Sequence, residues 1–200
     1  MQLKQRDPRI EAYLDASDII DFHDSAIQDL AAQLRRDHAD SHQLIAASFE
    51  WVRDRIAHSW DARQGPLTLR ASEVLRSGYG YCYAKSHLLA ALLRANGIPT
   101  GLCYQRLSSG EQGEPYCLHG LNAVLLPRHG WFRVDARGNK PGVHAVFAPP
   151  IEQLAFALQD AHERDFPDVL ADPLSVVVDA LRTQSDIFAL HDNLPDAIGI

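Results

Sequence analysis

The segment Ser77-Gly78-Tyr79-Gly80-Tyr81-Cys82 decides the fold, because a glycine-broken stretch runs there into a helical pattern. After Cys82 the apolar residues recur with helical spacing, at Ala84, Leu88, Leu89, Ala91, Leu92, Leu93 and Ala95. Asn96-Gly97-Ile98-Pro99 then interrupts the pattern, and glycine followed by proline is typical of a helix C-terminus. The sequence therefore predicts a helix that begins at Cys82 and ends before Gly97.

Cys82 occupies the N-terminus of this predicted helix. Unpaired N–H groups and the helix dipole favour an anion at such a position, so a thiolate is stabilised there. A lone cysteine on a helix is more often a packing residue, but Cys82 opens its helix beside two glycines. We therefore interpret Cys82 as a candidate nucleophile. Cys103 and Cys117 lie in strand-like runs and are interpreted as packing residues.

The composition limits the class of protein. Two hundred residues with 46% hydrophobic content can form one domain with a substantial core. A net charge of −7 argues against nucleic acid as a partner, because phosphate binding needs a basic face. The chain has no apolar run long enough for a membrane span and no apolar stretch of a secretory signal at its start. We expect a cytoplasmic protein with reduced cysteines, without a membrane partner; a Cys103–Cys117 bridge stays open.

The first half of the chain is mainly helical by its periodicity. Helices are expected from about Ser25 to Arg36, from a cap at Ser41 to about Ile56, and over Ala71–Arg76. The segment His58–Leu69 contains Gly65-Pro66 and is predicted to be a loop.

From Thr100 onward the pattern changes to strands. Thr100–Leu107, Cys117–Leu126 and Trp131–Val134 are apolar and β-prone, and Pro127–Gly130 connects the last two like a hairpin. Further helical stretches are expected around Ile151–Leu158 and Leu174–Arg182. Helices followed by an antiparallel sheet predict an α+β fold, with residues 1–200 forming one domain.

A thiolate nucleophile needs a base and a polar group that orients this base. His119 lies on one predicted strand and Asp135 ends the next. In an antiparallel pair joined at Pro127–Gly130 they are not equidistant from the turn, so a bulge or a shifted strand boundary is expected to bring them together.

These residues carry a resemblance to a known family. Gly80-Tyr81-Cys82-Tyr83-Ala84-Lys85-Ser86, with Arg94-Ala95-Asn96-Gly97-Ile98-Pro99, resembles the nucleophile helix of the transglutaminase-like superfamily. Downstream, Leu118-His119-Gly120-Leu121-Asn122 and Trp131-Phe132-Arg133-Val134-Asp135 resemble its histidine and aspartate motifs. The resemblance covers about residues 44–137 and extends to a bacterial branch with Asp135-Ala136-Arg137-Gly138-Asn139-Lys140. Its common H-A-W motif is His119-Gly120-Leu121 here, a departure that concerns substrate preference.

The resemblance implies a papain-like core and a Cys82–His119–Asp135 triad. It also implies acyl transfer from a peptide, protein or small amide through a thioacyl intermediate, without a metal or other cofactor. The backbone N–H of Cys82 is a natural oxyanion donor at a helix start, and Trp51 on the preceding helix is the expected second donor. Hydrolysis is preferred over cross-linking, because water is always present as an acceptor.

Other interpretations remain beside this one. A non-catalytic module could keep the groove to bind a peptide or protein, although a pure binder has no need of three separated polar residues. A redox-sensing thiol would need a resolving cysteine near Cys82. The histidines show no regular ligand spacing, which argues against a zinc site. Arg137, Asn139 and Lys140 form either a polar turn or part of the substrate cleft, and the sequence does not define the oligomeric state.

Overall fold

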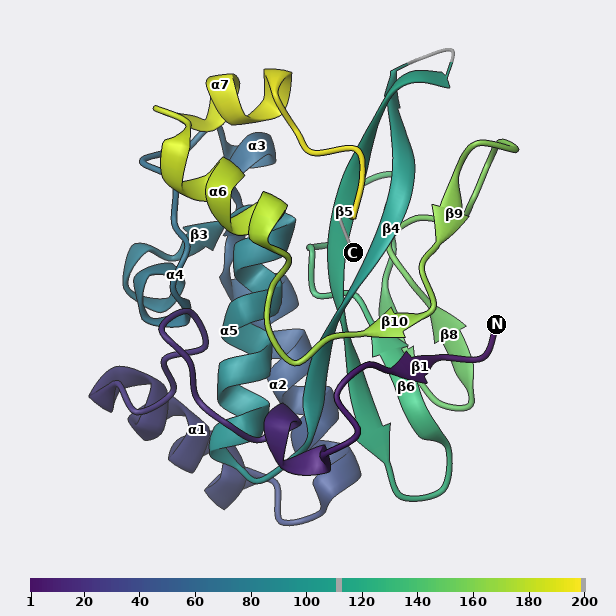
Figure 1. Cartoon of the computed structure of the whole chain (residues 1–200). Coiled ribbons are helices and arrows are strands. Elements are labelled where there is room, and N and C mark those ends of the chain that lie inside the picture. The colour runs from purple at the N-terminus through teal and green to yellow at the C-terminus, as the bar shows by residue number, and fades with distance from the viewer. Residues whose placement is uncertain (111–112, 199–200) are drawn as a thin grey trace.

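In the computed structural model, which describes residues 1–110 and 113–198, helices pack on one face of a curled sheet (Figure 1). The helices are α1 (Ser25–Asp37), α2 (Ser41–Arg55), α3 (Ser59–Ala62), α4 (Ala71–Ser77), α5 (Cys82–Ala95), α6 (Ser175–Thr183) and α7 (Ile187–Asp192), with a 3-10 turn at Ile10–Tyr13. The longer strands are β4 (Thr100–Gly110), β5 (Gly113–Leu126) and β6 (Gly130–Val134). The short strands are β1 (Lys4–Gln5), β2 (Ala57–His58), β3 (Tyr79–Gly80), β7 (Val146–Ala148), β8 (Ile151–Gln153), β9 (Arg164–Asp165) and β10 (Asp168–Val169).

Helix α5 is the centre of the fold. It begins at Cys82 as predicted, and every residue from Cys82 to Arg94 is buried. Helices α1, α2 and α4 cover it on one side, and β4 and β5 pack against it on the other (Figure 1). A helix that is surrounded on all sides must be apolar nearly all round, which explains the continuous Leu–Ala run.

The predicted helices before α5 are confirmed, with one correction at a helix start. Asp40, and not Ser41, caps α2: its Oδ1 accepts the N–H groups of His42 (3.0 Å) and Gln43 (3.1 Å). Aspartate and serine have about the same preference for the N-cap position. The residue types alone therefore do not show which of the neighbours Asp40 and Ser41 is the cap.

The main sheet has the order β6-β5-β4-β9, and its pairs are antiparallel. Strands β5 and β6 pair without interruption from Leu126↔Gly130 to Asn122↔Val134. The bulge expected between His119 and Asp135 is therefore absent; the register irregularity lies between Ser108 and Gly110 of β4. Extending the β5–β6 register puts Asp135 opposite Leu121, two residues from His119 on the same face. Diagonal neighbours of this kind lie within reach of long side chains.

One predicted segment is wrong in part and another is wrong. The expected loop His58–Leu69 begins with β2 and α3, because His58 continues a strand that pairs with β3. The helix expected around Ile151–Leu158 is instead β8, paired with β7, followed by irregular chain. Ile151 is 72% exposed, so the apolar residues of this segment do not form the buried face of a helix.

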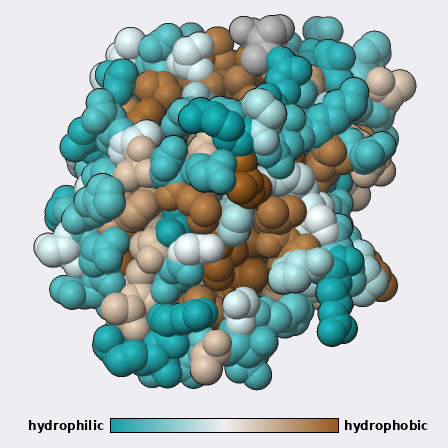
Figure 2. Space-filling view, turned by 60° about the horizontal axis from the view of Figure 1, so that its bottom comes forward, coloured by the Kyte–Doolittle hydropathy of each residue, from teal (hydrophilic) through white to brown (hydrophobic). Residues whose placement is uncertain are grey.

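The core has two parts. The larger lies around α5, and a smaller cluster on the outer face of the sheet contains Tyr13, Cys103, Leu121 and Val169. The end of the molecule turned forward in Figure 2 is mostly hydrophilic around a hollow with hydrophobic side chains. In the described part of the chain, no helix has the length and apolarity that crossing a bilayer would take.

Candidate active site

Cys82 is placed by the short strand pair just before it. β2 and β3 run parallel, with His58 opposite Gly80, so the chain enters α5 in an extended conformation. Tyr81 is the N-cap and offers no side-chain hydrogen bond. Because the first N–H groups of a helix have no intrahelical partner, the backbone N–H of Cys82 is an available hydrogen-bond donor at the N-terminus of α5.

Gly120 lets β5 approach this helix start. A Cβ atom added at Gly120 would lie 2.7 Å from Cδ1 of Tyr83 and 3.2 Å from its Cα. Contacts this short require the strand or the helix to move. The absence of a side chain at Gly120 therefore allows the residue next to it, His119, to lie beside the N-terminus of α5.

His119 and Asp135 form a buried pair. His119 Nε2 lies 2.8 Å from Asp135 Oδ2, and the two side chains are 6% and 0% exposed. The carboxylate also accepts the backbone N–H of Arg137 at Oδ1 (3.1 Å) and that of Ala155 at Oδ2 (3.0 Å). Phe156 meets the imidazole edge-on at 5.0 Å between ring centroids. These contacts hold the ring in one orientation.

The electrostatics of the pair favour the charged forms of both side chains. Burial opposes the imidazolium, but the charges of Asp135 and of a Cys82 thiolate raise the pKa of His119 to about 10. Burial also opposes the carboxylate, yet the charge and hydrogen bond of His119 lower the pKa of Asp135 overall. The imidazole of His119, charged by its contact with Asp135, therefore lies beside the side chain of Cys82.

Cys82 and His119 line the same cavity, which has a volume of about 390 Å³. Its wall is formed by α3 and the start of α5, by β4 and β5, by the segment after Asp135, and by the C-terminal segment. Besides Cys82 and His119, the side chains that line this cavity include His58, Trp60, Cys117, Arg137, Lys140, His191 and Leu194. The structure thus brings together Cys82, His119 and, behind His119, Asp135.

Trp51, the expected second oxyanion donor, is not brought to this cavity. It lies on α2 one full turn before the end of the helix, half-buried against the main core. Trp60 on α3 is the tryptophan that lines the cavity, stacked on His191 at 3.5 Å between ring centroids. The sequence signal was weak, because a helical pattern shows that Trp51 is partly buried but not against which surface.

Of the residues after Asp135, Arg137 and Lys140 line the cavity of Cys82 and are not part of a solvent-exposed polar turn. Arg137 forms a two-pronged ion pair with Asp61, and Lys140 Nζ lies 2.7 Å from Asp61 Oδ1. Both cations line the cavity, while Asn139 binds Ala145 and does not line it. Asp61 and His58 were not foreseen as site residues, because they lie in the predicted loop.

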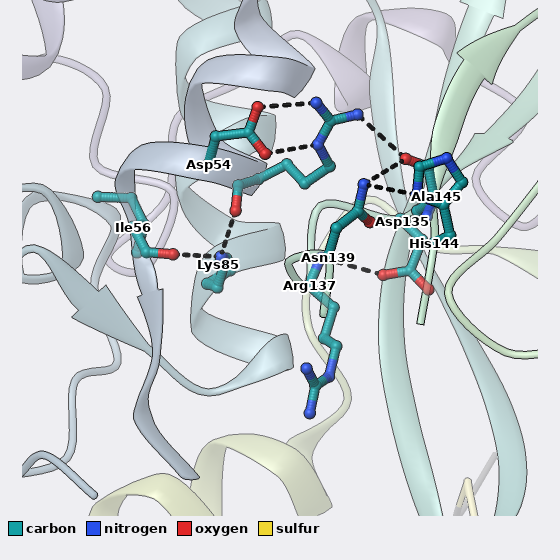
Figure 3. A network of polar contacts seen from close by, with 9 residues as sticks. Asp54, Ile56, Lys85, Asp135, Arg137, Asn139, His144 and Ala145 are labelled. Carbon is teal, nitrogen blue, oxygen red and sulfur yellow. Dashed lines mark hydrogen bonds and ion pairs between the residues drawn. The ribbon is translucent and has the colours of Figure 1, made fainter. Parts of the chain in front are cut away.

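A second polar network stabilises the region behind the cavity (Figure 3). Lys85, one turn after Cys82, is fully buried and donates to the carbonyl groups of Arg53 and Ile56 at the end of α2. Arg53 continues the network to Asp54 and to the carbonyl of Ala145. Burial lowers the pKa of Lys85 to about 7, and the nearby Arg137 contributes to this shift.

The three cysteines are free thiols. Cys117 lines the cavity with Cys82, whereas Cys103 is buried in the smaller core cluster. Burial raises the pKa of Cys117 to about 12. Over residues 1–110 and 113–198, no three His, Cys, Asp or Glu side chains converge as metal ligands would.

Comparison with known proteins gives one family match. The family described as the transglutaminase-like superfamily matches residues 28–136. Among curated proteins, none matches the sequence.

Solved structures of low sequence identity are similar to this chain. A protein named as a candidate cysteine protease from Cytophaga hutchinsonii is 18% identical with a TM-score of 0.54, over 66% of this chain and 43% of that one. The periplasmic domain of TgpA from Pseudomonas aeruginosa is 26% identical with a TM-score of 0.48, over 65% and 49%. This chain therefore matches less than half the length of either. The predicted α+β, papain-like fold is confirmed.

Proposed function

The chain belongs to the transglutaminase-like superfamily, and from this membership we propose a cysteine-dependent enzyme that cleaves or transfers amide bonds through a thioacyl intermediate on Cys82. One observation carries the proposal. Cys82 opens a buried helix and lines one cavity with His119, whose imidazole is hydrogen-bonded to the buried Asp135. Nucleophile, base and orienting carboxylate are the parts that thiol acyl transfer requires.

In the first half-reaction, the Cys82 thiolate attacks the carbonyl carbon of an amide, and a C–S bond forms. The C–N bond then breaks, and the proton of the His119 imidazolium goes to the departing amine. Asp135 keeps His119 in the orientation that directs its other nitrogen, Nδ1, to the thiol side. The products of this step are a thioacyl group on Cys82 and a free amine.

The oxyanion of this step needs hydrogen-bond donors at the helix start. The backbone N–H of Cys82 is one of them. Within the proposal, Trp60 replaces Trp51 as the side-chain donor, because Trp60 lines the cavity and Trp51 does not. The substrate is a peptide, a protein or a small amide, and water is the default acceptor.

Alkylation with iodoacetamide as a function of pH tests the nucleophile. We expect Cys82 to react well below pH 8, with the adduct located by mass spectrometry, and His119→Ala to abolish this reactivity. Cys117 is a matched internal control, because it lines the same cavity but its pKa is raised to about 12 by burial.

A second experiment uses p-nitrophenyl acetate, and acetylation of Cys82 in the wild type that is lost in His119→Ala supports the proposal. Equal, slow alkylation of all three cysteines, without acetylation, would contradict it and favour a binding module.

A further inference from the structure

His58 is a second histidine beside Cys82, and it comes from a different element than His119. The β2–β3 register puts His58 opposite Gly80, two residues before Cys82, and its ring lies 4.9 Å from that of Tyr81. His119 belongs to β5, which packs on another side of α5 (Figure 1). Both histidines line the cavity that contains Cys82.

The side chain of His58 is 6% exposed, yet it has no hydrogen-bond partner at Nδ1 among the residues described. Such buried, unpartnered polar atoms are uncommon in folded proteins. Nε2 is not among these enclosed atoms, which leaves it as the nitrogen of His58 that a molecule in the cavity can reach. Burial, together with the charge of Arg137, lowers the pKa of His58 well below its usual value, which keeps the ring neutral.

Asp61 determines which nitrogen of His58 carries the hydrogen. Its Oδ2 lies 3.8 Å from Nδ1, a charge contact that is longer than a hydrogen bond. Arg137 and Lys140 hold the carboxylate in place. A carboxylate facing Nδ1 favours the tautomer with hydrogen on Nδ1, so Nε2 carries a lone pair directed to the cavity.

A second cavity adjoins the first at His58. It has a volume of about 430 Å³ and shares His58 and Lys140 with the cavity of Cys82. Its other walls are the end of α2, α3 and the segment Gly138–Asn139. His58 therefore stands between the cavity that holds the thiol and a space from which a second molecule can approach.

We propose that His58, oriented by Asp61, is the base that activates the acyl acceptor, a water molecule or a primary amine arriving through the second cavity. The proposal rests on the thioacyl mechanism above. As the acceptor's oxygen or nitrogen bonds to the thioacyl carbon, its proton passes to Nε2 of His58. The C–S bond then breaks. The products are the free Cys82 thiolate and either a carboxylic acid, when the acceptor is water, or a new amide, when it is an amine. His58 releases its proton to solvent, and His119 takes one up to restore the initial ion pair.

Burst kinetics with p-nitrophenyl acetate separate the two half-reactions. The burst of p-nitrophenol reports acylation of Cys82, and the later steady rate reports transfer of the acetyl group. For His58→Gln we expect the burst to persist and the steady rate to fall by about 100-fold. His129→Gln is the control, since it changes an exposed histidine in the turn between β5 and β6, outside both cavities, and we expect both phases to stay unchanged.

Asp61→Asn provides a second variant that keeps the imidazole, and we expect a smaller loss of the steady rate with an intact burst. Added methylamine distinguishes the acceptors, because water yields acetate and the amine yields N-methylacetamide; His58→Gln should slow both. An unchanged steady rate in both His58→Gln and Asp61→Asn, or a burst that falls in parallel with it, overturns the role of His58. A wild-type chain that shows no burst and releases p-nitrophenol no faster than Cys82→Ala overturns the thioacyl mechanism and this inference with it.

Discussion

At the scale of single residues, the sharpest prediction concerns Asp135. Asp135→Asn keeps the size of the side chain but removes the charge that raises the pKa of His119. The imidazolium then loses its proton at lower pH, so the thiolate of Cys82 loses its counter-charge. We expect the alkylation rate of Cys82 at pH 6 to fall by about tenfold or more, measured by mass spectrometry over a pH series.

Asp165→Asn is the control for this change, because Asp165 is also an ion-paired carboxylate, but it is partly exposed and bound to Arg133 and Gln105 instead of a histidine. It should leave the pH profile unchanged. If Asp135→Asn leaves the pH dependence of Cys82 alkylation unchanged, Asp135 is not the residue that orients His119 and raises its pKa.

Single residues could be predicted where the signal is local. The position of Cys82 at a helix start, and those of His119 and Asp135 near strand ends in the order of the motifs, are visible in the sequence; that the three residues form a catalytic triad stays a prediction. His58 and Trp60 could not be found this way. Their place at the cavity depends on the parallel pairing of β2 with β3, which joins residues more than twenty positions apart and leaves no local pattern.

At the scale of elements, the contact between α5 and β5 depends on Gly120. Gly120→Ala puts a methyl group 2.7 Å from the ring of Tyr83, so helix and strand must separate. We expect a loss of about 1–3 kcal/mol in the free energy of unfolding, measured by urea denaturation. Because His119 moves with the strand, the alkylation of Cys82 should slow as well.

Gly65→Ala is the matched control, since a Cβ atom there meets nothing within 4 Å. If Gly120→Ala is as stable as the wild type, β5 and α5 can move apart without loss of free energy, and their close packing does not depend on Gly120.

Lys85 connects α5 to the end of α2, and its buried position predicts a pH-dependent stability. The unfolded chain holds the Lys85 proton up to about pH 10.5, whereas the folded chain releases it near pH 7. Between these values the unfolded state binds more protons, so stability rises with pH, by up to about 1.4 kcal/mol per pH unit. Urea unfolding at pH 6 to 9 should show this rise in the wild type relative to Lys85→Met. Parallel curves for the two proteins would contradict it.

Elements were predictable where periodicity coincides with burial, as in α1, α5 and α6. The strand β8 was missed because Ile151 is exposed and its spacing imitated a helix face. Within the predicted loop His58–Leu69, the end of β2 and the four-residue helix α3 have no signal in the sequence, because both are too short to show a period of two or of 3.6 residues.

At the scale of the whole molecule, both ends of the described chain are held by strands from other parts of the chain, at the N-terminal end in a separate two-stranded sheet. β1 pairs with β10, and beyond α7 the carbonyl of Pro195 accepts the N–H of Leu118, next to His119. Asp196 forms an ion pair with Arg106, and Leu194 lines the cavity of Cys82. Such contacts between distant segments carry no signal in the sequence around either partner. That residues 1–200 form one domain stays a prediction.

The C-terminal segment therefore forms part of the cavity wall, and its removal should open the site. We expect truncation after Asp192 to increase the alkylation rate of Cys82 severalfold, because Leu194 and the bond to Leu118 are lost together. Arg106→Ala removes the ion pair to Asp196, the bond to the His162 carbonyl and the contact with the Tyr116 ring, but it keeps the C-terminal segment, so its effect should be smaller and in the same direction. Circular dichroism establishes that α5 and the sheet persist in each variant. Slower alkylation after truncation would show that the segment orders the helix start, and not that it limits access to Cys82.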